Sequence, residues 1–264
     1  MRNGPLPAYS IRGSDAPVVR PHSHRSMTVN PNEILFLDAC ALSDAIRTRQ
    51  VSCRELMQAT LAQIDRLNPG FNAIVSLQPR ESLLSQADER DAQLARGEWL
   101  GWMHGFPQAI KDLAFTKGIR TTLGSPLLQD FVPQEDAIVV ERAKRSGAIV
   151  IGKTNVPEFG LGSQTYNNVF GATSNAWDST KCAGGSSGGA AVALALRMLP
   201  VADGSDMGGS LRNPAAYNNV FGLRPSAGRV PKYPAVEGFI EQLGTEGPMA
   251  RTVADLAMLL SVQA

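Results

Sequence analysis

Histidine and lysine are scarce in this sequence of 264 residues. The chain contains 3 histidines, none of them after His104, and only six of its 25 basic residues are lysines. Histidine is the side chain that most often transfers protons near neutral pH, so its scarcity limits the catalytic mechanisms open to the chain. The lysines are few enough to be considered one by one. They are Lys111, Lys117, Lys144, Lys153, Lys181 and Lys232.

Cysteine, long apolar runs and excess charge are also lacking. The 3 cysteines lie far apart and form no CxxC pair, which excludes a disulfide framework and a zinc ribbon. The best approach to a spanning helix, residues 182–196, is rich in glycine, alanine and serine and falls short of the roughly 18 residues required. The net charge of +1 gives no reason to expect nucleic acid or a membrane as a partner. We expect a soluble cytoplasmic protein with no metal and no cofactor.

The chain divides into residues 1–30 and residues 31–264. The first part is rich in arginine and has no periodic apolar pattern, so we expect a disordered tail or an extension upstream of a start at Met27. The second part alternates helical patterns with short apolar strands, which predicts one α/β domain with a mixed β-sheet flanked by helices. The expected helices cover residues 42–49, 52–68, 80–96, 136–146, 188–198, 211–217 and 253–262, and the expected strands cover 72–77, 106–112, 148–151 and 201–203. Ser52 and Glu55 form a capping-box pattern, and Pro69-Gly70 is expected to end the helix that follows it.

Residues 147–154, Gly-Ala-Ile-Val-Ile-Gly-Lys-Thr, match the phosphate-binding pattern GxxxxGK[ST]. In a true phosphate-binding loop the four middle residues form a loop between a strand and a helix. Here they are strong strand formers, a helical pattern precedes them, and Asn155-Val-Pro157 does not open a helix. We therefore interpret Gly147 as a helix cap and residues 148–151 as a buried strand.

Two patterns of serine catalysis also fail. Residues 184–188 match GxSxG, the nucleophile elbow of α/β-hydrolases, but no apolar strand precedes them and no histidine follows them. The order His104, acid, serine would suit a chymotrypsin-like barrel, which the alternation of helices and strands does not support. We favour His104 as a loop histidine that helps to position the strand after it.

Two glycine-serine clusters remain, at residues 184–189 and 206–212. Flexible linkage is the ordinary interpretation of such segments. Each cluster, however, leads directly into an expected helix, so backbone N–H groups and the positive end of the helix dipole converge near its serine. Such N–H groups can stabilise an oxyanion, and one donor contributes roughly 3–4 kcal/mol to the transition state. The donors concerned belong to Met207, Gly208, Gly209 and Ser210.

A serine nucleophile needs a base, and with histidine nearly excluded the natural candidate is a neutral lysine whose pKa burial has lowered. Lys111 follows the apolar pair Ala109-Ile110, so it can be buried at the end of a strand. Lys153 ends the other strand of this region. Spacing alone puts Lys111 only modestly ahead of Lys153.

Four segments together resemble the amidase signature family. They are residues 104–112, 152–159, 184–189 and 206–212, in the order that the family has them. The separation of 24 residues between Ser186 and Ser210 also fits, and the resemblance extends from about Ile34 to the end of the chain. It explains residues 147–154 as a strand of that family.

The resemblance implies a Ser–cis-Ser–Lys triad, with Ser210 as nucleophile, Ser186 as bridging serine and Lys111 as base. It thereby decides between Lys111 and Lys153. The expected reaction passes through an acyl-enzyme on Ser210, with the oxyanion bound by the N–H groups of residues 207–210. A cis peptide bond is expected before Ser186.

Ser187 and Arg212 match family positions that support the site. For Ser187 a helix cap, and for Arg212 a structural ion pair, are equally good interpretations. Met207 stands where many members of the family have threonine, which keeps the backbone donor but changes the pocket wall. Members of the family also continue well beyond Ala264, so we expect this chain to be the N-terminal part of an incomplete domain.

The resemblance implies an amidase that converts a small linear carboxamide into a carboxylate and an amine or ammonia. One alternative is the glutaminase-type subunit of a tRNA-dependent amidotransferase, which needs partner subunits; residues 212–214 and 226–230 look more like those of general amidases. A second alternative is a truncated, non-catalytic fragment. A third, less favoured, is a nucleotide-binding protein that uses residues 147–154. A homo-oligomer is compatible with the sequence.

Overall fold

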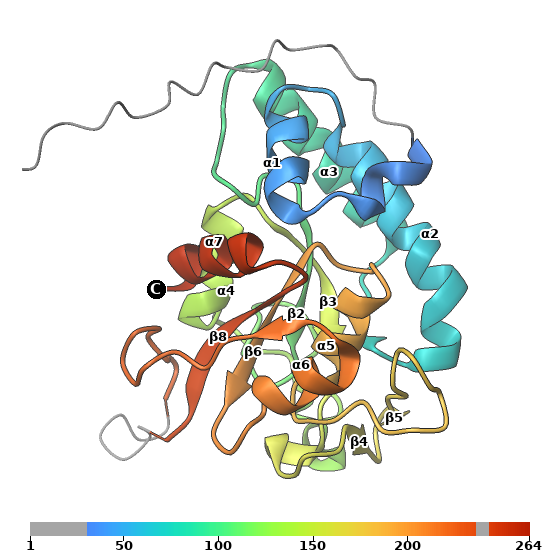
Figure 1. The fold of residues 1–264 in the computed structure, drawn as a ribbon. Helices are drawn as coiled ribbons and strands as arrows, with labels where there is room; N and C mark the ends of the chain where they lie inside the picture. Colours follow the sequence, from blue (N-terminus) through green and yellow to red (C-terminus); the bar gives the residue numbers. More distant parts are fainter. Residues whose placement is uncertain (1–30, 236–242) are drawn as a thin grey trace, which may run out of the picture.

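The computed structural model describes residues 31–235 and 243–264, so the expected tail, residues 1–30, lies outside the described residues. Two small sheets form the centre of the molecule, and helices surround them (Figure 1). The helices are η1 (Pro31–Phe36), α1 (Ala39–Arg47), α2 (Cys53–Phe71), α3 (Arg80–Ala95), η2 (Pro126–Leu128), α4 (Ile138–Arg145), η3 (Glu158–Gly160), α5 (Gly188–Ala195), α6 (Arg212–Asn218) and α7 (Val253–Gln263). The strands are β1 (Ile74–Val75), β2 (Pro107–Lys111), β3 (Ile149–Thr154), β4 (Tyr166–Asn167), β5 (Gly171–Ala172), β6 (Val201–Asp206), β7 (Phe221–Gly222) and β8 (Thr245–Ala250). The predicted class, α/β with a mixed sheet flanked by helices, is confirmed.

The two central sheets meet along β2 and β6. The first has the order β1-β3-β2, with β2 parallel and β1 antiparallel to β3, and the second is antiparallel with the order β6-β8-β7. The buried carboxylate of Asp203 on β6 joins them, because it accepts the backbone N–H of Lys111 at 3.0 Å and the side-chain amide of Gln108 at 3.3 Å. Lys111, the last residue of β2, is thereby held against β6.

The structural interpretation of residues 147–154 is confirmed in both of its parts. Residues 149–154 are β3, every residue of which is buried, so the GxxxxGK[ST] match is a strand. Gly147 follows α4 with a φ of 100° and its N–H donates to the carbonyl of Lys144 at 3.0 Å, which makes it the cap of that helix.

The predicted start of α2 is correct and its predicted end is wrong. Ser52 and Glu55 form the capping box, but the helix continues through Pro69-Gly70 to Phe71. Proline removes one N–H, and in the last turn that costs a single helical hydrogen bond. Asn72 then ends the helix in the left-handed conformation.

One strand of the core escaped the sequence analysis. β8 contains Gly247 and Pro248, residue types that usually mark turns, yet it is the middle strand of its sheet. Its pairing with β6 runs from Val201↔Ala250 to Asp206↔Thr245.

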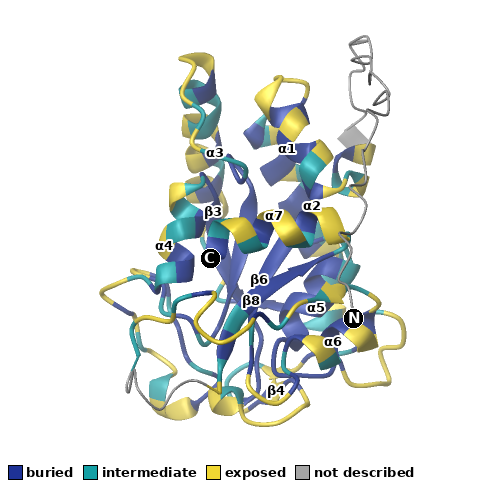
Figure 2. Ribbon diagram, turned by 60° about the vertical axis from the view of Figure 1, so that its left-hand side comes forward, coloured by how far each residue is buried: buried dark blue, intermediate teal, exposed yellow. Residues whose placement is uncertain are grey.

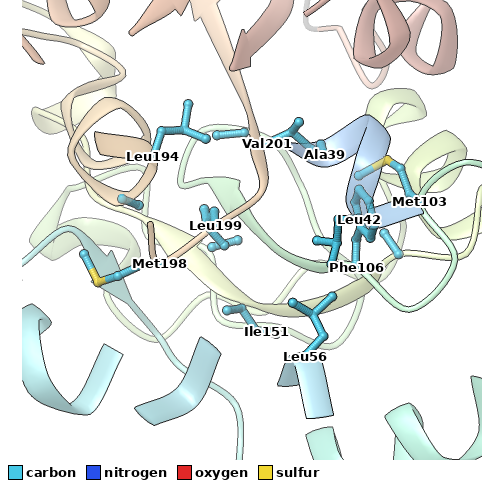
Figure 3. Packing of buried hydrophobic residues seen from close by; sticks show 14 of the residues in the cluster. Ala39, Leu42, Leu56, Met103, Phe106, Ile151, Leu194, Met198, Leu199 and Val201 are labelled. Atoms are coloured by element: carbon cyan, nitrogen blue, oxygen red, sulfur yellow. The ribbon is translucent and has the colours of Figure 1, made fainter. Parts of the chain in front are cut away.

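The main hydrophobic core lies between the sheets and the helices that cover them. Figure 3 shows part of it, with side chains from α1, α2, β3, α5, β6 and the segments just before β2 and β6: Ala39, Leu42, Leu56, Met103, Phe106, Ile151, Leu194, Met198, Leu199 and Val201. Burial is greatest in β2, β3, β6 and α5, whereas α3 and α4 present exposed residues outward (Figure 2). Within the described ranges no helix combines the length and the apolar character needed to cross a membrane.

Candidate active site

The predicted site residues come from three segments that meet at the ends of β2 and β6 (Figure 1). Lys111 ends β2, Ser186 and Ser187 lie in the turn before α5, and Ser210 lies in the turn between β6 and α6. β6 lies against both β2 and α5. Residues separated by up to 99 positions in the sequence are thus brought together.

The side chain of Lys111 is buried and its amine faces two serines. Nζ donates to Ser186 Oγ at 2.8 Å, and to the hydroxyl and carbonyl oxygens of Ser205 at 2.9 and 3.3 Å. Burial lowers the pKa of Lys111 to about 8, although the carboxylates of Glu246 and Asp203 act in the opposite direction. The amine can therefore lose its proton close to neutral pH.

The turn before α5 places two serines against β6. The peptide bond between Gly185 and Ser186 is cis, as predicted. Ser187 is the N-cap residue of α5, as the helix-cap interpretation has it, but its hydroxyl makes no capping hydrogen bond there. That hydroxyl instead lies 3.4 Å from both the N–H and the carbonyl of Ser205. The N–H of Ser187 donates to the carbonyl of Ser210 at 3.1 Å, which ties the two serine turns together.

Asp206 ends β6 and organises the turn that carries Ser210. Its buried carboxylate accepts the N–H groups of Gly209 at 2.7 Å and Leu211 at 3.1 Å, and two guanidinium nitrogens of Arg212 at 3.0 Å each. Burial acts to raise the pKa of Asp206, but the hydrogen bonds from Arg212 and from these N–H groups hold it well below its usual range. The structural ion pair, one of the two interpretations of Arg212, is present, and it ties Arg212 to the Ser210 turn.

The N–H groups of this turn are of two kinds. The N–H of Gly209 is already bound to Asp206, and Gly209 has a φ of 118°, a conformation that favours glycine. The N–H groups of Met207, Gly208 and Ser210 donate to no acceptor among the described residues. Gly209 therefore shapes the turn, and three N–H groups remain for an incoming oxygen atom.

Ser186 and Ser210 line the same cavity, whose volume is about 360 Å³. Ser186 and Ser210 are not hydrogen-bonded to each other in the part of the chain that is described. Lys232 and Glu246 contribute charged groups to the cavity. Most of the remaining wall is apolar: Leu113, Ala114, Phe115, Leu123, Ala137, Ile138, Val139, Phe159, Leu161, Met207, Pro231, Tyr233 and Pro234.

Comparison with known proteins agrees with the four motifs. A family model described as Amidase matches residues 55–264. The chain belongs to the amidase family. Among solved structures it is similar to a bacterial aryl acylamidase of the amidase signature enzymes, with 34% identity and a TM-score of 0.81 over 86% of this chain and 47% of that one. The peptide amidase from Stenotrophomonas maltophilia is similar too, with 35% identity and a TM-score of 0.78 over 86% of this chain and 47% of that one.

Curated relatives of this amidase-family chain are named as a subunit of a tRNA amidotransferase. The A subunit of glutamyl-tRNA(Gln) amidotransferase from Carboxydothermus hydrogenoformans is 44% identical over 87% of this chain and 47% of its own length. The protein of the same name from Methylococcus capsulatus is 44% identical over 84% of this chain and 45% of its own length. The chain spans about half the length of the curated relatives it matches.

The other titratable candidates of this amidase-family chain lie apart from the serines. The buried amine of Lys153 donates to the carbonyl of Ala114 at 2.6 Å and to the hydroxyl of Thr116 at 2.8 Å. His104 is buried before β2, where its ring stacks on Trp99 and contacts the carbonyl of Arg90 at 2.9 Å, which fits a positioning histidine. Residues 31–235 and 243–264 contain no group of three His, Cys, Asp or Glu side chains that could hold a metal ion.

Three residues beside the site were not singled out from the sequence. Asp203 anchors the backbone of Lys111, Ser205 contacts its amine, and Arg224 contacts the turn after β6. Two of them could have been noticed in the sequence, because Asp203 and Ser205 are polar residues inside the short strand β6. Arg224 follows β7 in a segment with no pattern that points to the site.

Proposed function

We propose that this chain carries the catalytic centre of an amidase that hydrolyses linear carboxamides through an acyl-enzyme on Ser210. The observation that carries the proposal is the hydrogen bond of 2.8 Å between the buried amine of Lys111 and Ser186 Oγ, on the cavity that Ser210 also lines. A lowered lysine pKa supports the role of base. Membership of the amidase family supports the class of reaction.

Acylation begins when neutral Lys111 accepts the hydroxyl proton of Ser186. Ser186 Oγ in turn accepts the proton of Ser210, whose Oγ forms a bond to the carbonyl carbon of the amide. The carbonyl π electrons move onto the oxygen, and this oxyanion accepts hydrogen bonds from the free N–H groups of the Ser210 turn. When the oxyanion collapses, the C–N bond breaks and the proton returns through Ser186 to the nitrogen, so the amine leaves neutral.

Deacylation uses the same proton path in the same order. Lys111 and Ser186 take a proton from a water molecule as its oxygen attacks the acyl carbon, and the second oxyanion rests on the same N–H groups. Collapse breaks the bond to Ser210 Oγ, which regains its proton from this path, and the carboxylic acid is released and gives its remaining proton to solvent to become the carboxylate. Ser187 and Arg212 support this cycle by holding the two serine turns in place.

The cavity favours a small substrate with an apolar acyl or aryl group. Its wall is largely apolar, and burying one substrate methylene there is worth about 0.8 kcal/mol. Lys232 and Glu246 add a charged region on the same cavity. We expect no cofactor to take part.

A second candidate is the glutaminase subunit of a tRNA-dependent amidotransferase. The identity of 44% to proteins named as the A subunit of glutamyl-tRNA(Gln) amidotransferase favours it. Glutamine would then be the amide, ammonia the released amine, and partner subunits would be required. The chemistry on Ser210 would be the same, so the two candidates differ in the amide used and in the need for partners.

The first experiment tests Ser210 with an activity-based probe and a panel of amides. The purified chain and its Ser210→Ala variant are incubated with a fluorophosphonate, then with aryl amides, aliphatic amides and glutamine. Lys111→Met is compared with the matched variant Lys153→Met, because both lysines are buried and only Lys111 touches a serine. We expect labelling to require Ser210, and Lys111→Met to lower kcat about 10³-fold, consistent with the loss of a general base.

The outcomes separate the candidates. Turnover of aryl or aliphatic amides supports the amidase, whereas turnover of glutamine alone, rising on addition of partner subunits, supports the amidotransferase candidate. Labelling without turnover supports a non-catalytic fragment. Absence of labelling, or labelling that survives in Ser210→Ala, refutes Ser210 as the nucleophile.

A further inference from the structure

The guanidinium of Arg224 binds the outer side of the Ser210 turn. Its Nη1 donates to the backbone carbonyl oxygens of Asp206 at 2.9 Å and Met207 at 2.7 Å, and to the carboxylate of Asp206 at 3.1 Å. Its Nη2 donates to the carbonyl of Leu243 at 2.9 Å. One side chain thus holds two consecutive peptide groups of the turn and fastens them to the segment before β8.

Those two peptide groups carry two of the three free N–H groups. The carbonyl of Asp206 shares its peptide plane with the N–H of Met207, and the carbonyl of Met207 shares its plane with the N–H of Gly208. Neither peptide bond is cis, so in each plane the N–H points away from the carbonyl. By holding both carbonyls, Arg224 keeps both N–H groups pointing away from its own side chain, and Met207 and Ser210 of the same turn line the cavity.

We propose that Arg224 is a positioning residue that aims the N–H groups of Met207 and Gly208 at the substrate oxyanion; this role rests on the proposed function. Arg224 touches no reacting atom. Its positive charge on the carbonyl side also polarises the two peptide groups, which strengthens the hydrogen bonds that their N–H groups donate.

Arg212 and Arg224 bind different groups of the Ser210 turn. Arg212 binds the carboxylate of Asp206, whereas Arg224 also binds backbone carbonyls. A guanidinium suits this task because its donors are fixed in a planar fork, so it can bind several oxygens at defined angles. The loss of Arg224 is therefore expected to alter the direction of the N–H groups while Arg212 still holds the carboxylate.

The test uses Arg224→Met and Arg224→Gln, with Arg229→Met as the matched control. Arg229 is exposed in the segment after β7, and its side chain makes no hydrogen bond among the described residues. We expect Arg224→Met to lower kcat about 10²-fold, and Arg224→Gln at least about tenfold, with KM within about threefold of wild type. Arg229→Met is expected to leave both constants unchanged. The melting temperature of each variant is measured in parallel.

A fall in kcat at constant KM is the signature of an interaction made in the transition state, which general loosening of the fold would not give. A kcat within twofold of wild type in either folded variant overturns the proposal, as does a rise in KM with kcat unchanged. Failure of both variants to fold also overturns it, because Arg224 would then serve stability. If the wild-type chain neither turns over amides nor reacts with the fluorophosphonate, the proposed function fails and the role of Arg224 fails with it.

Discussion

Lys111 and Lys153 have similar pKa values but different contacts, and the contacts are the reason for proposing Lys111 as the base. Burial lowers the pKa of both side chains to about 8, so either amine could be neutral near physiological pH. Only Lys111 contacts a serine, whereas the amine of Lys153 is held by a carbonyl and a threonine hydroxyl on the other side of β2 and β3. The same physical effect therefore serves different purposes at the ends of two neighbouring strands.

The proposed role of Lys111 makes the rate depend on pH. If neutral Lys111 is the base, kcat/KM must fall as pH decreases below its pKa of about 8, since protonation removes the acceptor for the proton of Ser186. We expect kcat/KM for a neutral aryl amide to rise about tenfold per pH unit below this midpoint and to level off above it. Rates measured from pH 6 to 10 test this. A profile that is flat between pH 6 and 8 would contradict the role of Lys111.

The site could be predicted in part from single residues. The glycine-serine clusters and the scarcity of histidine point to a serine with a lysine base, but spacing left Lys111 and Lys153 nearly equal, and the family resemblance made the choice. The contacts of Arg224 with the site could not be predicted from the sequence, because they are made with backbone carbonyls and its neighbours in sequence show no pattern. Contacts of that kind depend on where distant segments lie, which local sequence does not encode.

Among the helices, the start of α2 is an example of a structure that depends only on neighbouring residues. Its capping box is formed by Ser52 and Glu55 alone. Ser52 Oγ accepts the N–H of Glu55 at 3.1 Å, and the carboxylate of Glu55 accepts the N–H of Ser52 at 2.9 Å. Both partners lie within one turn, so nothing distant is needed to form them. The capping box was therefore predicted correctly from four residues.

We predict that Ser52→Ala lowers the free energy of unfolding by about 1 kcal/mol, because it leaves an N–H of the first helical turn without its acceptor. Ser85→Ala is the matched control: Ser85 is exposed within α3, and its side chain makes no hydrogen bond among the described residues. Equilibrium unfolding in urea measures both variants. Equal stability of the two would show that the cap contributes nothing.

The elements that were missed depend on their surroundings. Gly247 and Pro248 are residue types that favour a turn, yet β8 is held in place by β6 on one side and β7 on the other. Pro69 is a residue type that ends helices, yet α2 continues for two more residues and is capped by Asn72. In both cases tertiary contacts outweigh a weak local preference, which is the usual limit of propensity.

At the scale of the whole molecule, α5 couples the core to the site. It begins immediately after Ser186 and Ser187, it is buried from Gly188 to Leu194, and it contacts β1, β2, β3, β6 and β8. Its sequence of glycine, alanine and small aliphatic residues lets the helix approach the strands closely. The position of Ser186, the proposed bridging serine, therefore depends on how near α5 can lie to the strands.

Gly189 is a position where α5 lies against the backbone of its neighbours. A Cβ at Gly189 would lie 2.4 Å from the backbone N of Asn155 and 2.5 Å from the carbonyl oxygen of Ala73. These are backbone atoms, so they cannot move aside as a flexible side chain would. We expect Gly189→Ala to lower the free energy of unfolding by about 3 kcal/mol, as overpacking in a core does. Urea unfolding measures the change.

Gly70→Ala is the control for this substitution. Gly70 lies in α2, and a Cβ there would meet no atom within 4 Å. Alanine favours the helix over glycine by roughly 1 kcal/mol, so this variant should be as stable as wild type or more so. If Gly189→Ala were as stable as Gly70→Ala, α5 would have room to move from the strands, and the close packing that fixes Ser186 beside Lys111 would not be a constraint on this fold.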